Sequence, residues 1–181
     1  MNASNAAPPG RRDFLKQALA GSIGAIVGLV PFGAGLLFFL DPLRRRALAG
    51  GLVRVTTLEA LPDDGVPRKF PVLATRLDAW NKFTQVPIGA VYLRRTANGP
   101  VQAFNVVCPH AGCFVDFLPD RGLYLCPCHN STFTIAGRIE DRASPAARGL
   151  DALQVELRGG TEVWVKFQNF QAGRAEKIPT A

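Results

Sequence analysis

Every cysteine and histidine of the 181-residue chain lies in two short segments between positions 108 and 129. The first segment reads Cys108-Pro109-His110-Ala111-Gly112-Cys113, and the second reads Cys126-Pro127-Cys128-His129-Asn130-Ser131. Thiolates are soft metal ligands and imidazoles are borderline ones. Two such segments, which together hold the whole supply of both residue types, indicate a metal site.

The residues alone leave two kinds of metal centre open. A tetrahedral zinc site would take two cysteines and two histidines, and two thiols would be left without a metal. A two-iron, two-sulfide cluster needs two ligands on each iron, so two cysteines could hold one iron and two histidines the other. The two cysteines that remain could then form a disulfide between the segments, a bond that persists outside the cytoplasm.

The spacing C-x-H-x-x-C followed by C-x-C-H-x-S resembles the Rieske iron–sulfur proteins. The resemblance implies a Rieske-type 2Fe-2S cluster, with two cysteines on one iron and two histidines on the other. The ligands that it implies are Cys108, His110, Cys126 and His129. It also implies a disulfide between Cys113 and Cys128, because an extra cysteine in each segment is typical of the Rieske subunits of quinol-oxidising cytochrome bc and bf complexes.

Three residues that follow His129 bear on the properties of the implied cluster. Ser131 matches the family serine whose hydroxyl donates to a cluster sulfide. Phe133 stands where many ubiquinol-type members have a tyrosine that donates to a ligand cysteine. We therefore expect a lower reduction potential, which would suit a menaquinol-type donor. Asn130 replaces the glycine that is usual at its position, so the backbone there could differ.

The resemblance also implies where quinol and a covering loop would lie. His129 is the expected hydrogen-bond partner of quinol, with His110 exposed beside it. Histidine ligands suit this donor because an imidazole can take up a proton when the cluster takes up an electron. Residues 143–150, which include Ser144 and Pro145, lie where the bc-type family has a proline-containing loop over the cluster.

Electron transfer is the function that the resemblance implies. The chain would take one electron from quinol bound to a cytochrome b subunit and pass it to a c-type cytochrome, without catalysing a reaction alone. The small subunit of a molybdenum oxidase such as arsenite oxidase is the alternative with the same cluster, and a retained membrane helix favours the quinol-oxidising subunit. A zinc-stabilised binding domain is the alternative of another class, and it would be colourless and give no EPR signal.

Residues 18–40 contain no ionisable side chain, and we predict that they form one transmembrane helix. A helix of this length spans about 35 Å, slightly more than the roughly 30 Å of bilayer hydrocarbon. A soluble domain of this size rarely holds a helix that is apolar on every side.

The preceding residues, 1–17, resemble a twin-arginine export signal through Arg11-Arg12-Asp13-Phe14-Leu15-Lys16. The signal predicts a cytoplasmic N-terminus in a bacterial inner membrane, with the soluble domain on the outer, periplasmic side. Three arginines also follow the apolar run, so charge alone does not orient it. Ala47-Leu48-Ala49 fits a cleavage site, but the run is longer than the roughly 7–15 residues of a typical signal core, which favours a retained anchor.

The net charge of +7 does not indicate a nucleic-acid partner. Residues 1–46 hold six basic and two acidic side chains, so more than half of the excess flanks the apolar run. The remaining 135 residues hold 15 basic and 12 acidic ones. They show no basic stripe interleaved with aromatic side chains, which is the pattern that nucleic-acid binding would need.

Residues 52–170 are predicted to form an all-β domain, a Rieske-like antiparallel β-sandwich with a small cluster-binding part at about 106–133. Short runs of Val, Leu, Phe and Tyr alternate there with Pro, Gly and Asp, and no stretch after Arg46 has a helical period. Residues 41–51 would form a tether, and the polar tail at 171–181 is expected to be loosely held. The candidate strands are Leu52–Leu58, Phe70–Thr75, Gly89–Arg94, Val101–Val107, Gly122–Leu125, Leu153–Leu157 and Val163–Phe167, and the last two form a hairpin.

Overall fold

The computed structural model describes residues 10–44, 51–77 and 81–180. The chain divides into two units, residues 1–46 and residues 47–181, and each has its own fold. The first unit is helical, and the described residues of the second form strands and loops without a helix. The predicted combination of one N-terminal helix and an all-β domain is therefore confirmed.

Helix α1 (Arg11–Arg44) contains the predicted apolar segment and extends beyond it at both ends. It is long and apolar enough to cross a membrane, with a mean hydropathy of 2.3 and no part of the apolar stretch buried. Residues 41–44 of the expected tether belong to this helix. The rest of the tether at 45–50, with the candidate cleavage site, lies outside the described residues.

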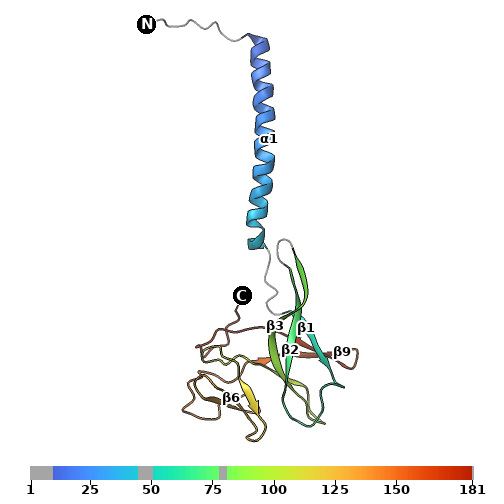
Figure 1. Cartoon of the computed structure of the whole chain (residues 1–181), viewed down its shortest axis with the longest axis vertical. Helices are drawn as coiled ribbons and strands as arrows, with labels where there is room; N and C mark the ends of the chain where they lie inside the picture. Colours follow the sequence, from blue (N-terminus) through green and yellow to red (C-terminus); the bar gives the residue numbers. More distant parts are fainter. Residues whose placement is uncertain (1–9, 45–50, 78–80, 181) are drawn as a thin grey trace. The chain divides into compact units, whose positions relative to one another are not determined.

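Three antiparallel sheets make up the described part of the second unit (Figure 1). Their strands are β1 (Leu52–Thr57), β2 (Arg68–Leu77), β3 (Lys82–Arg94), β4 (Gln102–Asn105), β5 (Asp116–Leu118), β6 (Leu123–Cys126), β7 (Ser131–Thr134), β8 (Ala152–Leu153), β9 (Val155–Arg158) and β10 (Glu162–Lys166). The strand orders are β1-β10-β9, β2-β3-β4-β8 and β5-β6-β7. The third and smallest sheet holds the second cysteine-histidine segment.

The four-stranded sheet contributes to two hydrophobic cores because successive side chains of a strand point to opposite faces. Val91 and Leu93 of β3 pack into one core together with Val163 of β10. Tyr92, which lies between them, packs on the opposite face, where its ring centroid is 5.0 Å from that of Tyr124 in β6. One face of the sheet therefore supports the sandwich, and the other supports the small sheet.

Each of the seven predicted strands overlaps an observed strand, and the predicted hairpin corresponds to β9–β10. The predicted strand Leu153–Leu157 is divided in the structure between β8 and β9, which belong to different sheets. Strand β3 begins at Lys82 rather than Gly89. Residues 82–88 are almost all exposed, so they lack the apolar alternation that marks a half-buried strand. The sequence does not predict β5 and β7, which have three and four residues and are held in place by pairing with β6.

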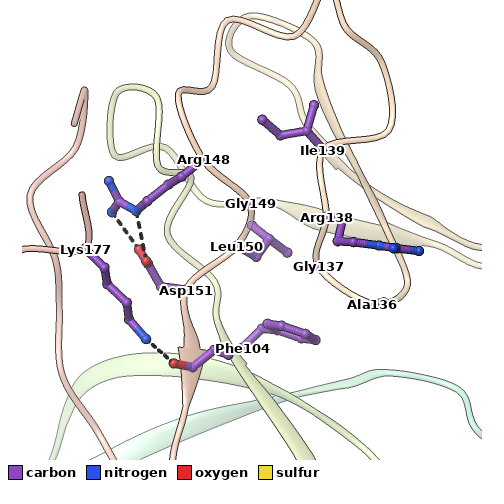
Figure 2. A pocket seen from close by; sticks show the side chains of 11 residues that line it. Phe104, Ala136, Gly137, Arg138, Ile139, Arg148, Gly149, Leu150, Asp151 and Lys177 are labelled. Carbon is purple, nitrogen blue, oxygen red and sulfur yellow. Dashed lines mark hydrogen bonds and ion pairs between the residues drawn. The ribbon is translucent and has the colours of Figure 1, made fainter. Parts of the chain in front are cut away.

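The C-terminal tail is attached to the domain, so the expectation of a loosely held tail is wrong for residues 171–180. The N–H of Thr180 donates to the carbonyl oxygen of Asn169 at 2.9 Å. Arg148, whose side chain is drawn in Figure 2, donates to the carbonyl oxygen of Gln171 at 3.0 Å. Backbone groups supply these contacts, so the polar side chains of the tail give no sign of them.

Candidate metal centre

The first cysteine-histidine segment forms a closed loop between β4 and β5. The N–H of Cys108 donates to the carbonyl oxygen of Cys113 at 2.7 Å, and the carbonyl oxygen of Cys108 accepts from the N–H of Gly112 at 3.0 Å. Gly112 has a φ of 84°, a left-handed conformation that glycine adopts without strain. Outside this turn, the N–H of Val115 donates to the carbonyl oxygen of Val106 at 2.8 Å. The backbone therefore fixes both ends of the segment.

The second segment forms the turn of the β6–β7 hairpin. Cys126 and Ser131 pair across the two strands, so the residues between them make the turn. Asn130 has a φ of 56°, in the left-handed region that glycine favours. Asparagine is one of the few other residues that tolerate this region. The replacement of glycine at this position therefore does not prevent the left-handed conformation.

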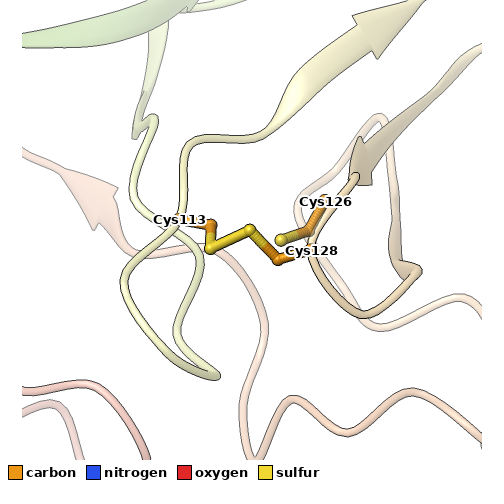
Figure 3. A group of neighbouring side chains, drawn as sticks. All are labelled: Cys113, Cys126 and Cys128. Atoms are coloured by element: carbon orange, nitrogen blue, oxygen red, sulfur yellow. A yellow bond between two sulfur atoms is a disulfide. The ribbon is translucent and has the colours of Figure 1, made fainter.

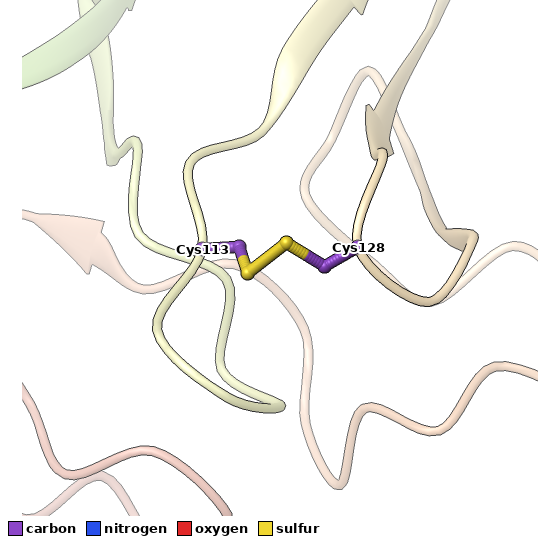
Figure 4. The surroundings of a disulfide bond; sticks show 2 residues. All are labelled: Cys113 and Cys128. Atoms are coloured by element: carbon purple, nitrogen blue, oxygen red, sulfur yellow. A yellow bond between two sulfur atoms is a disulfide. The ribbon is translucent and has the colours of Figure 1, made fainter.

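A disulfide joins the two loops (Figure 3 and Figure 4). It connects Cys113 and Cys128, the pair that the resemblance implies, with their sulfur atoms 2.05 Å apart and their Cα atoms 6.5 Å apart. The sulfur of Cys126 lies within 4.8 Å of both of these sulfurs (Figure 3). Sulfurs in a disulfide offer no thiolate, so Cys126 is the member of this group that can ligate a metal.

Cys108 and Cys126 are free thiols and are buried, with 0% and 1% of their surface exposed. Burial raises the pKa of the Cys108 thiol; the backbone N–H of His110 opposes this change, and the neighbouring Cys126 thiol adds to it. The two thiols therefore lie close enough to influence each other. A bound cation would reverse the effect of burial and hold both as thiolates.

His110 and His129 bring two imidazole rings together from different loops. The ring centroids are 4.7 Å apart, and the ring planes cross at 84°. Nδ1 of His110 is buried and has no hydrogen-bond partner among the described residues, although the residue as a whole is partly exposed. A buried ring nitrogen without a partner destabilises the fold unless a ligand satisfies it. His129 is exposed.

The donor set fits a 2Fe-2S cluster with mixed ligands. Two free thiols and two imidazoles lie on two loops that a disulfide ties together, and these are soft and borderline ligands for iron. The hydroxyl oxygen of Ser131 is also buried and lacks a partner among the described residues. An iron–sulfur group would supply ligand bonds for the thiols and imidazoles and an acceptor for this hydroxyl.

Phe133 lies in the same hydrophobic core as both free thiols and is fully buried. It pairs with Tyr124 across the β6–β7 ladder. A phenyl ring carries no hydrogen-bond donor, so the structure has an apolar contact where the resemblance would allow a tyrosine hydroxyl.

Residues 143–150 pack onto this core through Ala146 and Leu150. The N–H of Ala146 donates to Oγ of Ser144 at 3.4 Å, and Ser144 is half-buried. Pro145 is exposed. The segment that is expected to cover the cluster is therefore fixed to the subdomain that contains both loops.

Several residues that hold the first loop were not predicted from the sequence. Buried Asn105 accepts a hydrogen bond from the N–H of Val107 at 3.0 Å and donates to the carbonyl oxygen of Gln168 at 2.9 Å. Arg148 and Asp151 form a buried ion pair with a nitrogen–oxygen distance of 2.8 Å. Opposite charges three residues apart were a signal for this pair, whereas nothing in the sequence marks Asn105.

Comparison with known families agrees with the geometry of the two loops. Residues 55–156 match the family model of the Rieske [2Fe-2S] domain. The chain therefore belongs to the Rieske [2Fe-2S] family, and its cofactor is a Rieske-type 2Fe-2S cluster.

Curated relatives of the chain include iron–sulfur subunits of a menaquinol:cytochrome c reductase and of cytochrome b6-f complexes. The menaquinol:cytochrome c reductase iron-sulfur subunit of Geobacillus thermodenitrificans is 28% identical over 153 residues, covering 83% of this chain and 87% of the relative. The cytochrome b6-f complex iron-sulfur subunit of Synechococcus sp. (strain JA-2-3B'a(2-13)) is 29% identical over 171 residues, covering 92% of this chain and 91% of the relative. Among solved structures, the cyanobacterial plasma membrane Rieske protein PetC3 from Synechocystis PCC 6803 is 26% identical, covers 64% of this chain and 99% of its own, and has a TM-score of 0.46.

Proposed function

We propose that this chain is the electron-transferring Rieske subunit of a quinol:cytochrome c oxidoreductase. It takes one electron from quinol bound to a cytochrome b subunit and passes it to a c-type cytochrome. The observation that carries the proposal is the pair of imidazoles, His110 and His129, beside two buried free thiols on loops joined by a disulfide. The relatives, which are iron–sulfur subunits of a menaquinol:cytochrome c reductase and of a cytochrome b6-f complex, support the same assignment, as does the helix that could span a membrane.

Four side chains hold the cluster in this proposal. Cys108 and Cys126 would hold one iron, because their thiols are free and almost completely removed from solvent. His110 and His129 would hold the other iron, because their imidazole rings lie together and part of each residue is exposed. Nδ1 of His110 is the expected ligand atom, since it is buried and lacks a partner. Nε2 is then the ring nitrogen that carries the exchangeable proton.

The histidines let this chain couple proton uptake to electron uptake. The cluster, when bound, supplies one-electron redox chemistry in the range of roughly −150 to +300 mV known for Rieske centres. Once Nε2 has lost its proton, His129 would accept the hydrogen bond of quinol there, because His129 is the more exposed of the two histidines. A fall in the positive charge beside the imidazoles would make them hold a proton more firmly. The buried hydroxyl of Ser131 would donate to a cluster sulfide and so favour negative charge there.

The covering loop and the anchor complete the proposed assignment. Ser144 and Pro145 belong to a segment that is fixed to the cluster-binding core through Ala146, and it shields the cluster from water. Helix α1 anchors the chain in a bacterial inner membrane, with residues 1–17 as a cytoplasmic twin-arginine signal and the Rieske domain on the periplasmic side.

Purification of the full chain from its native membranes tests this function. The proposal expects cytochrome b to co-purify and the reduced sample to give a Rieske EPR spectrum that shifts when a quinol-site inhibitor is added. Co-purification with a molybdopterin subunit, or an EPR spectrum that no quinol-site inhibitor changes, would overturn it. A quinol-oxidising complex must pass both parts of this test, whereas a soluble electron carrier passes neither.

A further inference from the structure

We propose that Arg148, Asp151 and residues 168–180 form a clasp that positions the first cluster loop, with Arg148 as the positioning residue. Residues of this clasp come from the end of the covering loop and from the tail. The inference rests on the proposed ligation by His110. The tests below measure amide exchange in the first loop and the EPR spectrum of the cluster. Neither requires electron transfer from quinol, so the clasp and the proposed function can fail separately.

The ion pair is the fixed centre of the clasp. Nε of Arg148 lies 2.9 Å from Oδ1 of Asp151, and Nη2 lies 2.8 Å from Oδ2 (Figure 2). The two side chains are only 10% and 6% exposed. Removal of either partner would leave a buried charge without compensation, and a lysine could not reproduce the two-pronged contact.

The third nitrogen of the guanidinium reaches the tail. Nη1 of Arg148 donates to the carbonyl oxygen of Gln171 at 3.0 Å and to that of Arg174. These two carbonyl groups lie on either side of Gly173 in the sequence. A planar fork can therefore hold the carboxylate with two nitrogens and the tail with the third.

Gly173 contacts the first cluster loop. Its N–H donates to the carbonyl oxygen of Pro109 at 2.8 Å, and Pro109 is fully buried between Cys108 and His110 in the sequence. Gly173 has a φ of 71°, and a Cβ on it would lie 3.7 Å from the carbonyl oxygen of His110. Arg148 thus acts on two proposed ligands through one residue of the tail.

Asn105 ties the same parts to the central sheet. Its backbone N–H donates to the carbonyl oxygen of Asp151 at 2.9 Å. Its side-chain amide donates to Gln168 and Asn169 at 2.9 Å each, and its Oδ1 accepts from the N–H of Val107 at 3.0 Å. The start of the first loop, the ion pair and the tail are therefore parts of one hydrogen-bonded unit.

Hydrogen exchange on the cluster-loaded full chain tests the clasp. In Arg148→Lys, we expect amide exchange at residues 108–113 and 171–175 to rise about tenfold, with little change at residues 126–131. The EPR spectrum of the reduced cluster should shift, because the histidine from the first loop changes its orientation. Arg138→Ala is the control, since Arg138 is an exposed arginine that lines the same pocket as Arg148 (Figure 2), and it should change neither reading.

Gly173→Ala tests the other end of the clasp and leaves the ion pair intact. A side chain at a φ of 71° is strained, so exchange should again rise at residues 108–113 and the spectrum should shift. Unchanged exchange at residues 108–113 in both variants would overturn the proposal. A rise of equal size in both cluster loops would also overturn it, because it would show general destabilisation.

Discussion

Cys126 and Ser131 are paired residues at the turn end of the β6–β7 ladder. Both are buried; the thiol is free, and the hydroxyl oxygen has no partner among the described residues. One backbone pair therefore places a proposed iron ligand beside a hydrogen-bond donor. In the proposed site, this one hairpin would therefore supply both an iron ligand and a donor that adjusts the reduction potential of the cluster.

Ser131→Ala should lower the reduction potential of the cluster. Its hydroxyl stabilises the reduced state, so a bond worth about 1.4 kcal/mol corresponds to about 60 mV for one electron. A redox titration followed by EPR measures the change. Thr132→Val is the control, because Thr132 is the next residue along β7 and also has a buried oxygen without a described partner. Equal potentials for wild type and Ser131→Ala would contradict the assigned hydrogen bond.

Phe133→Tyr should raise the potential, because a new hydroxyl in this buried core could donate to a ligand sulfur. The expected size is again about 60 mV for a bond of about 1.4 kcal/mol. Phe117→Tyr is a suitable control, since Phe117 packs against the same core and its ring is 5.3 Å from that of Tyr124. The same redox titration applies. If both variants shift the potential alike, the effect does not come from a specific contact at position 133.

Replacement of the disulfide should reduce stability without removing any proposed ligand. Cys113 and Cys128 are 15 residues apart, and closing a loop of this size contributes about 3 kcal/mol in the chain-entropy account. The free energy of unfolding of the double variant Cys113→Ser/Cys128→Ser should therefore be lower by about 3 kcal/mol, seen as a lower urea midpoint. The variant should still bind the cluster. Cys126→Ser should instead abolish cluster binding. A double variant that is as stable as wild type would show that the disulfide does not hold the loops together.

The two buried tyrosines should respond differently to removal of their hydroxyls. Tyr92 accepts from the N–H of Phe117 at 3.0 Å and donates to the carbonyl oxygen of Val115 at 3.3 Å. Tyr124 has no described partner for its hydroxyl. Tyr92→Phe should therefore cost about 1–3 kcal/mol at pH 7, whereas Tyr124→Phe should be neutral or slightly stabilising. Urea unfolding followed by tryptophan fluorescence compares them.

The buried phenol of Tyr124 predicts that the domain loses stability at alkaline pH. Burial raises the pKa of Tyr124 above its ordinary value, so the folded state favours the neutral phenol. The stability linked to this group is complete below the unfolded pKa of about 10 and is lost as pH rises above it. Tyr124→Phe should therefore lose less stability than wild type between about pH 9 and pH 11, a range that brackets the unfolded pKa of about 10. An identical loss in the two proteins would contradict the assignment.

The sequence predicts the fold best where strands are half-buried and end at turn residues. The β9–β10 hairpin fits this description, because Val163 and Val165 are buried on alternate positions and glycines form the turn. The first half of β3 does not fit it, since residues 82–88 are almost all exposed. Strand β7 begins with Ser131 and Thr132, and their burial follows from the cluster-binding core rather than from local apolar character.

The site was predicted from side-chain types, and what was missed depends on backbone contacts. Cysteines and histidines are rare in this chain and close together, so they mark both loops. The N–H of Gly173 that reaches Pro109 has no sequence signal, since any non-proline residue carries such a group. Polar tails are usually mobile, and the contacts of Arg148 with backbone carbonyls are the reason that this one is held.

Nitrogen couplings to the reduced cluster test the central claim most directly. Pulsed EPR of full-length protein whose histidines carry ¹⁵N should show two strongly coupled histidine nitrogens, from His110 and His129. His129→Cys is a useful comparison, because it replaces one imidazole by a thiolate and should leave one coupling if a cluster still forms. Two coupled nitrogens in the wild type are the predicted result. A reduced cluster without histidine couplings, or a zinc-containing protein without an EPR signal, would contradict the account.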